Sequence, residues 1–168
     1  MDARPGIDRS RAVRRVRRGR SRPAGRYRDA MRRALFVRVN RVVNVVVRRL
    51  GLRRFRGGDL LLLTTTGRRS GQRRTTPLLH LARDGGWLVV ASNGGADWEP
   101  GWWLNLRAGA PGTVEVDGRA VPVRGEEVTG PEREQLWGEL TERVFDFDSY
   151  QAKVSRRIAV VRLTPTSG

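Results

Sequence analysis

The sequence predicts a mainly β domain, a small antiparallel barrel with flanking helices, preceded by a basic N-terminal segment. Six short runs of β-branched and large apolar residues lie between positions 60 and 164. Asp84-Gly85-Gly86 and Asp117-Gly118 are typical of tight hairpin turns. Few long crossovers separate these runs, which favours a small barrel over a doubly wound sheet.

The runs define the expected elements in chain order. The predicted strands cover residues 60–66, 74–82, 87–92, 113–116, 119–128 and 158–164. Helical spacing of apolar residues predicts one helix over 99–108 and another over 131–145. The second of these helices opens on Pro131, a residue favoured in the first helical turn.

Charge divides the chain into two parts. The whole chain has 34 basic and 17 acidic residues, a net charge of +17. Residues 1–57 hold twenty arginines and three aspartates, so the remainder is neutral, with fourteen charges of each sign. Residues 1–27 have almost no large apolar side chains, and we expect a disordered arm there. The predicted domains are this arm, a basic amphipathic helix over 28–56 and a barrel over 57–168.

Residues 28–50 place valines, leucines and a phenylalanine on one arc of a helical wheel and arginines on the other. Too many arginines interrupt this stretch for a transmembrane span. Two interpretations are open: a helix that lies on an anionic membrane surface, and a helix packed on the barrel with a solvated basic face. The arginine arm could also contact nucleic-acid phosphates, but without interleaved aromatic residues or a docking motif we expect no specific nucleic-acid partner.

Composition also excludes several kinds of site. The chain contains no cysteine, which excludes disulfides, zinc–thiolate sites and cysteine catalysis. Its single histidine, His80, rules out a multi-histidine metal site, so we predict no metal. His80 lies in an alternating run and is expected to be a half-exposed strand residue.

The most informative stretch is the turn after the first predicted strand. Gly67 and Gly71 bracket it, so backbone N–H groups can approach a ligand there. Four arginines stand on this turn and its exit, and their forked donors suit phosphate or carboxylate: Arg68, Arg69, Arg73 and Arg74. The alternative is an ordinary solvated basic turn. The neutral charge of the surrounding domain favours a specific anion site.

Four motifs then resemble one known family. They are TTGRRSGQ with RTTPL (65–72, 74–78), VASNGGA (90–96), PGWWLNLRA (100–108), and YQ with IAVVRL (150–151, 158–163). Their order and spacing resemble the deazaflavin-dependent nitroreductase family, actinobacterial FMN-binding-like split β-barrel proteins that use coenzyme F-420. The resemblance covers essentially the whole predicted barrel.

The resemblance implies a long, anionic cofactor, coenzyme F-420, with FMN as the less suitable alternative because its tail carries less charge. The cofactor contacts that it implies are Arg68, Arg69, Ser70, Gly71, Arg74, Thr75, Thr76, Pro77, Ala91, Ser92, Asn93, Gly94, Pro100, Gly101, Trp102 and Asn105. Of these, Trp102 has a second interpretation as an ordinary core aromatic.

The same resemblance implies an oxidoreductase that transfers a hydride from the reduced cofactor to an electrophilic acceptor. Ser92 and Tyr150 are the expected catalytic residues, and Trp103, Phe147 and Tyr150 are expected to line the acceptor site, although Tyr150 could be an ordinary helix-face aromatic. A menaquinone-like quinone is the leading acceptor. Nitroaromatics, fatty acyl chains and other conjugated systems stay open, as does a non-catalytic cofactor-binding role. We expect a cytoplasmic protein, peripheral on the inner membrane face if residues 28–50 bind lipid, and a homodimer is compatible with the fold.

Overall fold

The computed structural model describes residues 53–55 and 57–166. The basic arm expected over residues 1–27 and most of the amphipathic helix expected over 28–56 lie outside the described residues and stay predictions. At the end of that helical range, the described residues Arg54 and Phe55 form a short strand instead.

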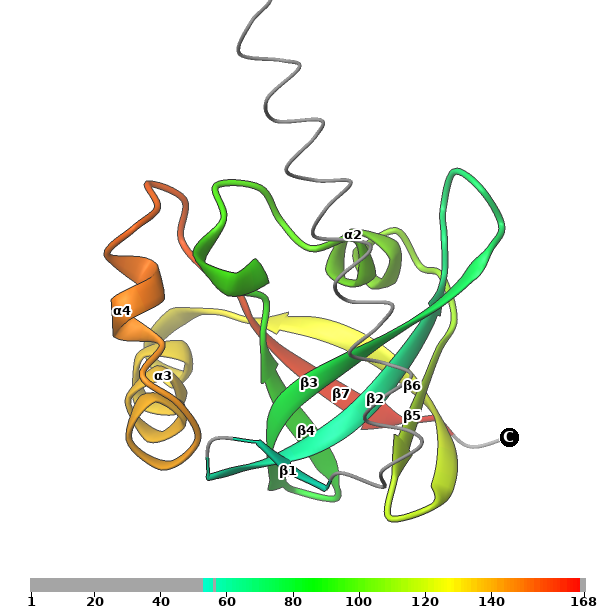
Figure 1. The fold of residues 1–168 in the computed structure, drawn as a ribbon, viewed down its shortest axis with the longest axis horizontal. Coiled ribbons are helices and arrows are strands. Elements are labelled where there is room, and N and C mark those ends of the chain that lie inside the picture. The colour runs from blue at the N-terminus through cyan, green and yellow to red at the C-terminus, as the bar shows by residue number, and fades with distance from the viewer. Residues whose placement is uncertain (1–52, 56, 167–168) are drawn as a thin grey trace, which may run out of the picture. The chain divides into compact units, whose positions relative to one another are not determined.

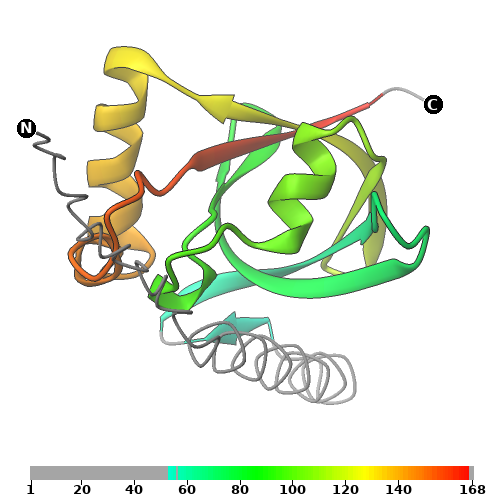
Figure 2. The ribbon, with the colours of Figure 1, turned by 90° about the horizontal axis from the view of Figure 1, so that it is seen from above.

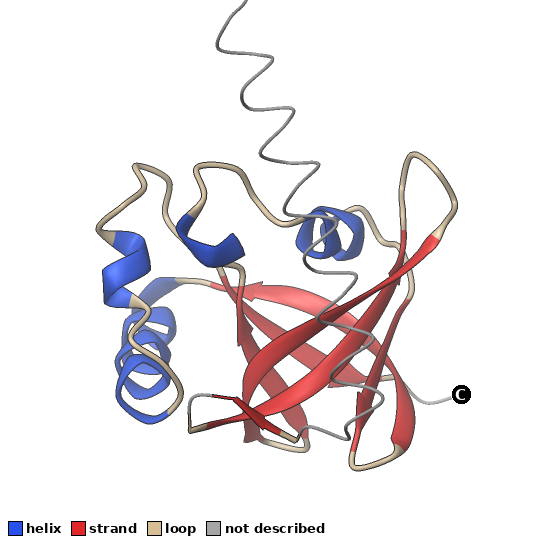
Figure 3. Cartoon of the chain, in the orientation of Figure 1, coloured by secondary structure: helices blue, strands red, loops and turns tan. Residues whose placement is uncertain are grey.

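The described chain forms an antiparallel barrel, and the mainly β class is confirmed (Figures 1 and 3). The sheet order is β1-β2-β3-β4-β7-β6-β5, and β2 also pairs with β5, which closes a barrel of β2 to β7. The strands are β1 Arg54–Phe55, β2 Gly58–Thr66, β3 Arg73–Arg83, β4 Gly86–Val90, β5 Gly112–Val116, β6 Arg119–Val128 and β7 Val160–Pro165.

Local sequence explains the tight hairpins. Asp84 and Gly85 join β3 to β4, and Asp117 and Gly118 join β5 to β6, all four with positive φ. Two successive residues of positive φ give a turn whose twist matches that of the flanking strands. The two hairpin turns predicted from Asp-Gly pairs are therefore confirmed.

Two apolar clusters hold the barrel together. The inner cluster joins inward-facing strand residues such as Leu63 and Val114 to Trp103 and Leu106 of α2 (Gly101–Arg107). Figure 2 shows α2 across one opening of the barrel. The outer cluster joins residues of β4 and β7 to α3 (Gly130–Arg143) and to the chain near α4 (Asp148–Gln151). These clusters fix α2 at one end of the barrel and α3 on its flank.

Several expectations need correction. The strand predicted over 87–92 ends at Val90, because the chain then turns into the short 3₁₀ helix η1 (Asn93–Gly95). The last strand begins at Val160 and not at residue 158. Elements β1, η1 and α4 were not among the predicted ones. They are two to four residues long, too short to produce a periodic signal.

His80 is a strand residue as expected, but its predicted half-exposure is wrong. It lies on β3 opposite Asp59 of β2 and Val89 of β4, and only 7% of it is exposed. Burial lowers the pKa of its imidazole below the ordinary value of 6.5, and the nearby Asp59 opposes this shift. The single histidine is therefore a buried, neutral side chain near pH 7.

Among helices in the described ranges, none combines the length and apolarity that crossing a bilayer requires.

Candidate functional site

The turn between β2 and β3 is a compact, internally bonded loop. Gly67 N–H donates to the carbonyl of Gln72 at 2.9 Å, and Gly71 N–H donates back to the carbonyl of Gly67 at 2.8 Å. Gly71 has a φ of +64°, in the left-handed region. A Cβ on Gly67 would lie 2.7 Å from Ser70 Oγ, so the loop closes tightly over that glycine. This packing holds the loop in one shape and leaves its arginines on the outside.

The arginines of this turn differ from most others in the described chain. Arg107 and Arg143, for example, hold glutamates at 2.8 Å and 2.6 Å. Within residues 53–55 and 57–166, no ion pair forms at any of the four exposed arginines on the turn and its exit, which are Arg68, Arg69, Arg73 and Arg74. Four cations that no described carboxylate neutralises can bind a polyanionic ligand without first breaking an ion pair.

Asn105 of α2 connects this turn to the barrel. Its Oδ1 accepts hydrogen bonds from Arg68 N (3.2 Å) and Arg68 Nη1 (3.4 Å), while its Nδ2 donates to Thr65 Oγ1 at 3.0 Å. Asn105 is 5% exposed and Thr65 is 1% exposed. The amide therefore restrains the position of Arg68, while the direct cofactor contact expected of Asn105 from the sequence stays a prediction.

A second loop follows β4 and carries Ser92. Ala91 N–H donates to Ala159 O at 2.9 Å, and Gly95 N–H donates to Ser92 O at 3.0 Å. Asn93 has a φ of +52°, and its Nδ2 donates to Trp98 O at 3.0 Å. Gly94 and Gly95 share this left-handed conformation, so the backbone bends sharply immediately after the predicted catalytic serine.

Tyr150 of α4 lies beside this second loop. A Cβ built on Gly95 would be 3.3 Å from Tyr150 Cδ1, so the ring packs directly on that glycine. Its ring centroid is 5.1 Å from that of Phe145, and Lys153 Nζ lies 5.2 Å above its face. Ser92 and Tyr150, the two predicted catalytic residues, thus belong to adjacent segments, although they are 58 positions apart in the sequence.

Three predicted aromatic contacts are core residues in the structure. Trp102 and Trp103 belong to the inner cluster, and Trp103 is only 1% exposed. Phe147 is 4% exposed, with its ring 5.4 Å from that of Phe145. Both Trp103 and Phe147 are therefore packed within the core, and their expected contact with the acceptor stays a prediction. The alternative interpretation of Trp102 as a core aromatic agrees with its burial.

The remaining predicted contacts flank the same end of the barrel. Figure 1 shows the β2–β3 turn, α2 and η1 together at this end. Thr75, Thr76 and Pro77 are half-buried on β3 as it leaves the turn, and Pro100 is buried immediately before the exposed Gly101 of α2. The polar members of the set therefore come from the β2–β3 turn, the start of β3, the Ser92 loop and α2.

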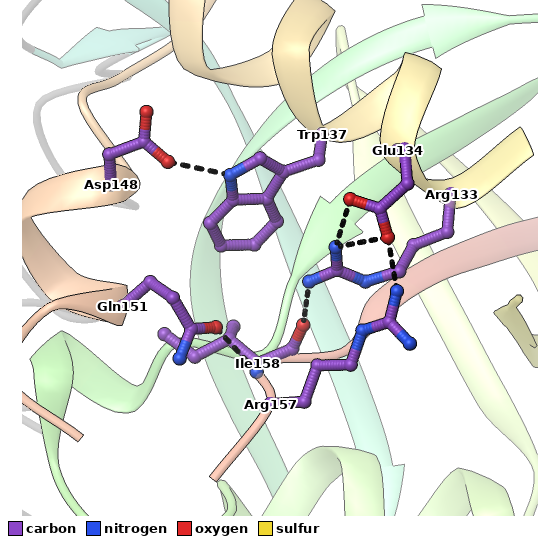
Figure 4. A network of polar contacts seen from close by, with 7 residues as sticks. All are labelled: Arg133, Glu134, Trp137, Asp148, Gln151, Arg157 and Ile158. Atoms are coloured by element: carbon purple, nitrogen blue, oxygen red, sulfur yellow. Dashed lines mark hydrogen bonds and ion pairs between the residues drawn. The ribbon is translucent and has the colours of Figure 1, made fainter. Parts of the chain in front are cut away.

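Sequence reasoning did not identify Arg156. Its guanidinium donates to three backbone carbonyls of the Ser92 loop, namely Ala91 O at 3.2 Å, Ser92 O at 2.9 Å and Ala96 O at 3.1 Å. The adjacent Arg157 is exposed and pairs with Glu134 (Figure 4). Nothing in an Arg-Arg pair tells which of the two side chains turns inward, so the sequence carried no signal for this role.

The sequence is similar to proteins of one known family. The family model described as F420H(2)-dependent quinone reductase matches residues 35–165. The chain belongs to this family. An F420H(2)-dependent quinone reductase of Mycobacterium tuberculosis is 40% identical over 108 residues, which are 62% of this chain and 72% of that protein. A protein of Mycobacterium bovis described in similar terms aligns equally well, at 40% identity over 108 residues.

Solved structures agree with this assignment. An F420-H2 dependent reductase superposes with a TM-score of 0.56 at 33% identity, over 62% of this chain and 92% of that one. A second protein, solved as a domain-swapped dimer, gives a TM-score of 0.57 at 28% identity over 84% of this chain and 99% of that one. The predictions of an F-420-dependent oxidoreductase and of the barrel fold are confirmed.

Proposed function

We propose that the protein reduces a quinone with reduced coenzyme F-420, and that its two loops divide the work. The arginine turn between β2 and β3 binds the anionic tail, while Ser92 and Tyr150 bind the acceptor. The observation that carries the proposal is the turn itself, where four exposed arginines lack a described ion-pair partner at the barrel end that also holds the Ser92 loop. Membership of the family supports the choice of cofactor and acceptor.

The residues at this end suit a flavin-like ring with a phosphate-linked, carboxylate-bearing tail. Arg68, Arg69 and Arg74 offer charged forked donors, and Ser70 adds a neutral hydroxyl. On the Ser92 loop, the left-handed Gly94 is exposed and has no side chain, so a ligand can approach its peptide groups closely. The positive charge of the β2–β3 turn suits the anionic tail of the cofactor, and the accessible backbone of the Ser92 loop suits its ring.

On the acceptor side, the chain's own residues position the quinone and handle a proton. When bound, the reduced cofactor supplies a hydride, and a proton then completes reduction of a quinone to a quinol. The Ser92 hydroxyl orients a carbonyl oxygen by a hydrogen bond. The Tyr150 phenol donates to the same acceptor and can pass it the proton. Packing on Gly95 fixes the ring of Tyr150 beside the loop that carries Ser92.

Cofactor binding is tested by titrating oxidised coenzyme F-420 into the full chain and following fluorescence, with FMN in parallel. We expect binding at micromolar concentration or tighter, weak binding of FMN, and loss of at least about tenfold in affinity for Arg68→Ala/Arg74→Ala, since charge-assisted hydrogen bonds are worth roughly 1.5–3 kcal/mol each. Arg119→Ala/Arg124→Ala is the charge-matched control, because both residues are exposed on β6. Equal loss in both double variants would refute a specific clamp.

Acceptor reduction is tested with the reduced cofactor, menadione and quinones with longer isoprenoid tails. Turnover with quinones, falling in Tyr150→Phe and Ser92→Ala while the cofactor affinity stays within a few-fold, supports the proposal. A wild-type protein that binds the cofactor but leaves every quinone unchanged refutes the acceptor assignment. Nitroaromatic and fatty acyl acceptors in the same assay then separate the alternatives.

Assembly and location are part of the proposal. The domain-swapped dimer of a related structure supports a homodimer, which light scattering of the purified chain would test. We place the enzyme in the cytoplasm. Contact with an anionic membrane through residues 28–50 rests on sequence alone, since those residues lie outside the described ranges.

A further inference from the structure

Arg156 is a half-buried cation with an unusual set of partners. Its Nη2 donates to both Ala91 O (3.2 Å) and Ser92 O (2.9 Å), and its Nε donates to Ala96 O at 3.1 Å. These carbonyls lie at the two ends of the Ser92 loop, so one guanidinium spans the whole loop. Burial lowers the pKa of Arg156 below its ordinary value, against the opposing effect of Glu99 and Asp97.

The backbone that carries Arg156 is itself held in place. Gln151 of α4 donates from Nε2 to Arg156 O at 2.8 Å and accepts from Ile158 N at 2.9 Å, so one side chain clasps both ends of the turn before β7. Arg133 of α3 donates to Ile158 O at 2.9 Å, and its guanidinium lies 4.7 Å from the ring centroid of Trp137. Figure 4 shows the two bonds to the backbone of Ile158, from Gln151 and from Arg133. Arg156 therefore projects from a fixed position.

The loop that it grips needs such support. Asn93, Gly94 and Gly95 are all left-handed, and a non-glycine residue in this region carries a conformational cost. The loop makes its own hydrogen bonds from Gly95 N to Ser92 O and from Ala96 N to Asn93 O, the latter at 3.3 Å. Ser92 lies within the span of Arg156, and Tyr150 packs on Gly95. Movement of this loop displaces both residues of the proposed acceptor site.

We propose that Arg156 is a positioning residue that holds the Ser92 loop in the conformation required for hydride transfer to the acceptor. It acts through the carbonyls of Ala91, Ser92 and Ala96 and touches neither the cofactor tail nor the acceptor. This inference rests on the proposed function of that loop. Lysine cannot replace it, because one ammonium cannot reach three divergent carbonyls with the fork geometry of a guanidinium.

The test compares Arg156→Ala and Arg156→Lys with Arg157→Ala, a control whose side chain is exposed and paired only with Glu134 among the described residues. The first readout is amide hydrogen exchange of Gly95 and Ala96 in the cofactor-free protein. We expect faster exchange at both amides in the Arg156 variants and wild-type exchange in the control. Equal exchange in Arg156→Ala and Arg157→Ala overturns the inference.

The second readout is quinone turnover at saturating reduced cofactor. We expect kcat to fall about tenfold or more in Arg156→Ala, because misplacement of catalytic groups by about 1 Å can cost two orders of magnitude. The affinity for the cofactor should change much less, since the arginine turn is a separate loop. Added guanidinium should restore part of the turnover of Arg156→Ala, and it should not affect Arg157→Ala. An unchanged kcat overturns the inference.

Two further outcomes keep the proposals separate. If Arg156→Ala does not fold, Arg156→Lys carries the test, with partial loss of turnover and intermediate amide exchange as the expected result and wild-type values as the contrary one. If the wild type reduces no quinone, the proposed acceptor is wrong, while the amide-exchange comparison still decides whether Arg156 holds the loop.

Discussion

Replacing Asn105 by alanine removes one buried amide that joins α2, β2 and the arginine turn. The bond from Asn105 Nδ2 to Thr65 Oγ1 dominates the energetic cost, because both residues are at least 95% buried and water cannot replace the lost donor. Leaving a buried hydroxyl unsatisfied costs about 1–3 kcal/mol. The two bonds from Arg68, one from its backbone N–H and one from its guanidinium, contribute less, because that residue is exposed and water can replace the lost acceptor. We therefore expect Asn105→Ala to lower the free energy of unfolding by about 2 kcal/mol and the melting temperature by roughly 4–8 °C.

Urea unfolding of Asn105→Ala, Thr65→Val and the double variant measures the buried bond directly. Thr65→Val removes the hydroxyl while keeping the branched shape, so the double variant leaves no orphaned donor or acceptor on this axis. The two substitutions should be less damaging together than the sum of their separate effects, with a coupling of about 1 kcal/mol. Strictly additive effects would refute the assigned bond.

The same variant separates positioning from direct contact with the cofactor. If Asn105 acts through Arg68, Asn105→Ala should weaken coenzyme F-420 binding several-fold in the wild-type background. It should have little further effect in Arg68→Ala, because the group that it orients is already gone. Fluorescence titration of the wild type, Asn105→Ala, Arg68→Ala and the double variant measures the four cofactor affinities that this comparison needs. Independent, multiplying losses would mean that Asn105 touches the cofactor itself, as the resemblance to the family first suggested.

Two other predictions concern stability. Burial lowers the folded-state pKa of His80 below 6.5, so the unfolded chain binds this proton more readily, and the free energy of unfolding is highest above about pH 6.5 and falls as the pH decreases. In urea unfolding, His80→Leu should therefore reduce the dependence of stability on pH between about pH 7 and 5. The same pH dependence in the variant and the wild type would contradict this. A Cβ on Gly86 would lie 2.5 Å from Leu163 O, so Gly86→Ala should push β4 away from β7 and lower the free energy of unfolding by about 2 kcal/mol. A Cβ on Gly138 in α3 meets no neighbouring atom, so Gly138→Ala should raise the free energy of unfolding by about 0.5–1 kcal/mol. Thermal melts of the two alanine variants should therefore shift in opposite directions.

Most of the barrel was predictable from the sequence because its signals are local. An Asp-Gly pair determines a tight hairpin within a few residues. Residues 60–66, before Gly67, are all leucine or threonine, and this run has a length and composition typical of a strand. The arginine turn was predictable for the same reason: its glycines, arginines and serine are contiguous. The ends of the strands were less predictable. β4 ends at Val90 because the chain turns into η1, and that turn is held by Arg156, about 60 residues later in the chain.

The internal cations and buried rings were not predictable, because burial depends on packing between remote segments. Arg156 and Arg157 are identical in type and adjacent, yet one spans the Ser92 loop while the other pairs with Glu134 at the surface. Phe147 and Trp103 likewise fill the core, although flat rings near an expected active site suggested substrate contact. Their roles follow only from the tertiary structure.

The chain contains two arginine sites that differ in exposure and in hydrogen bonding. At Arg156 a single half-buried cation donates to backbone carbonyls, and this arrangement restrains the Ser92 loop. At the β2–β3 turn four exposed cations stand close along the chain without a described carboxylate between them, and their mutual repulsion is screened but not removed by water. Under the proposed function, the anionic tail of the cofactor would relieve that repulsion, because it would supply the negative charge that no described carboxylate supplies. Arg156 and the arginine turn contact different loops, so under the proposed function the protein can bind an anionic tail at one loop without disturbing the residues that position the acceptor at the other.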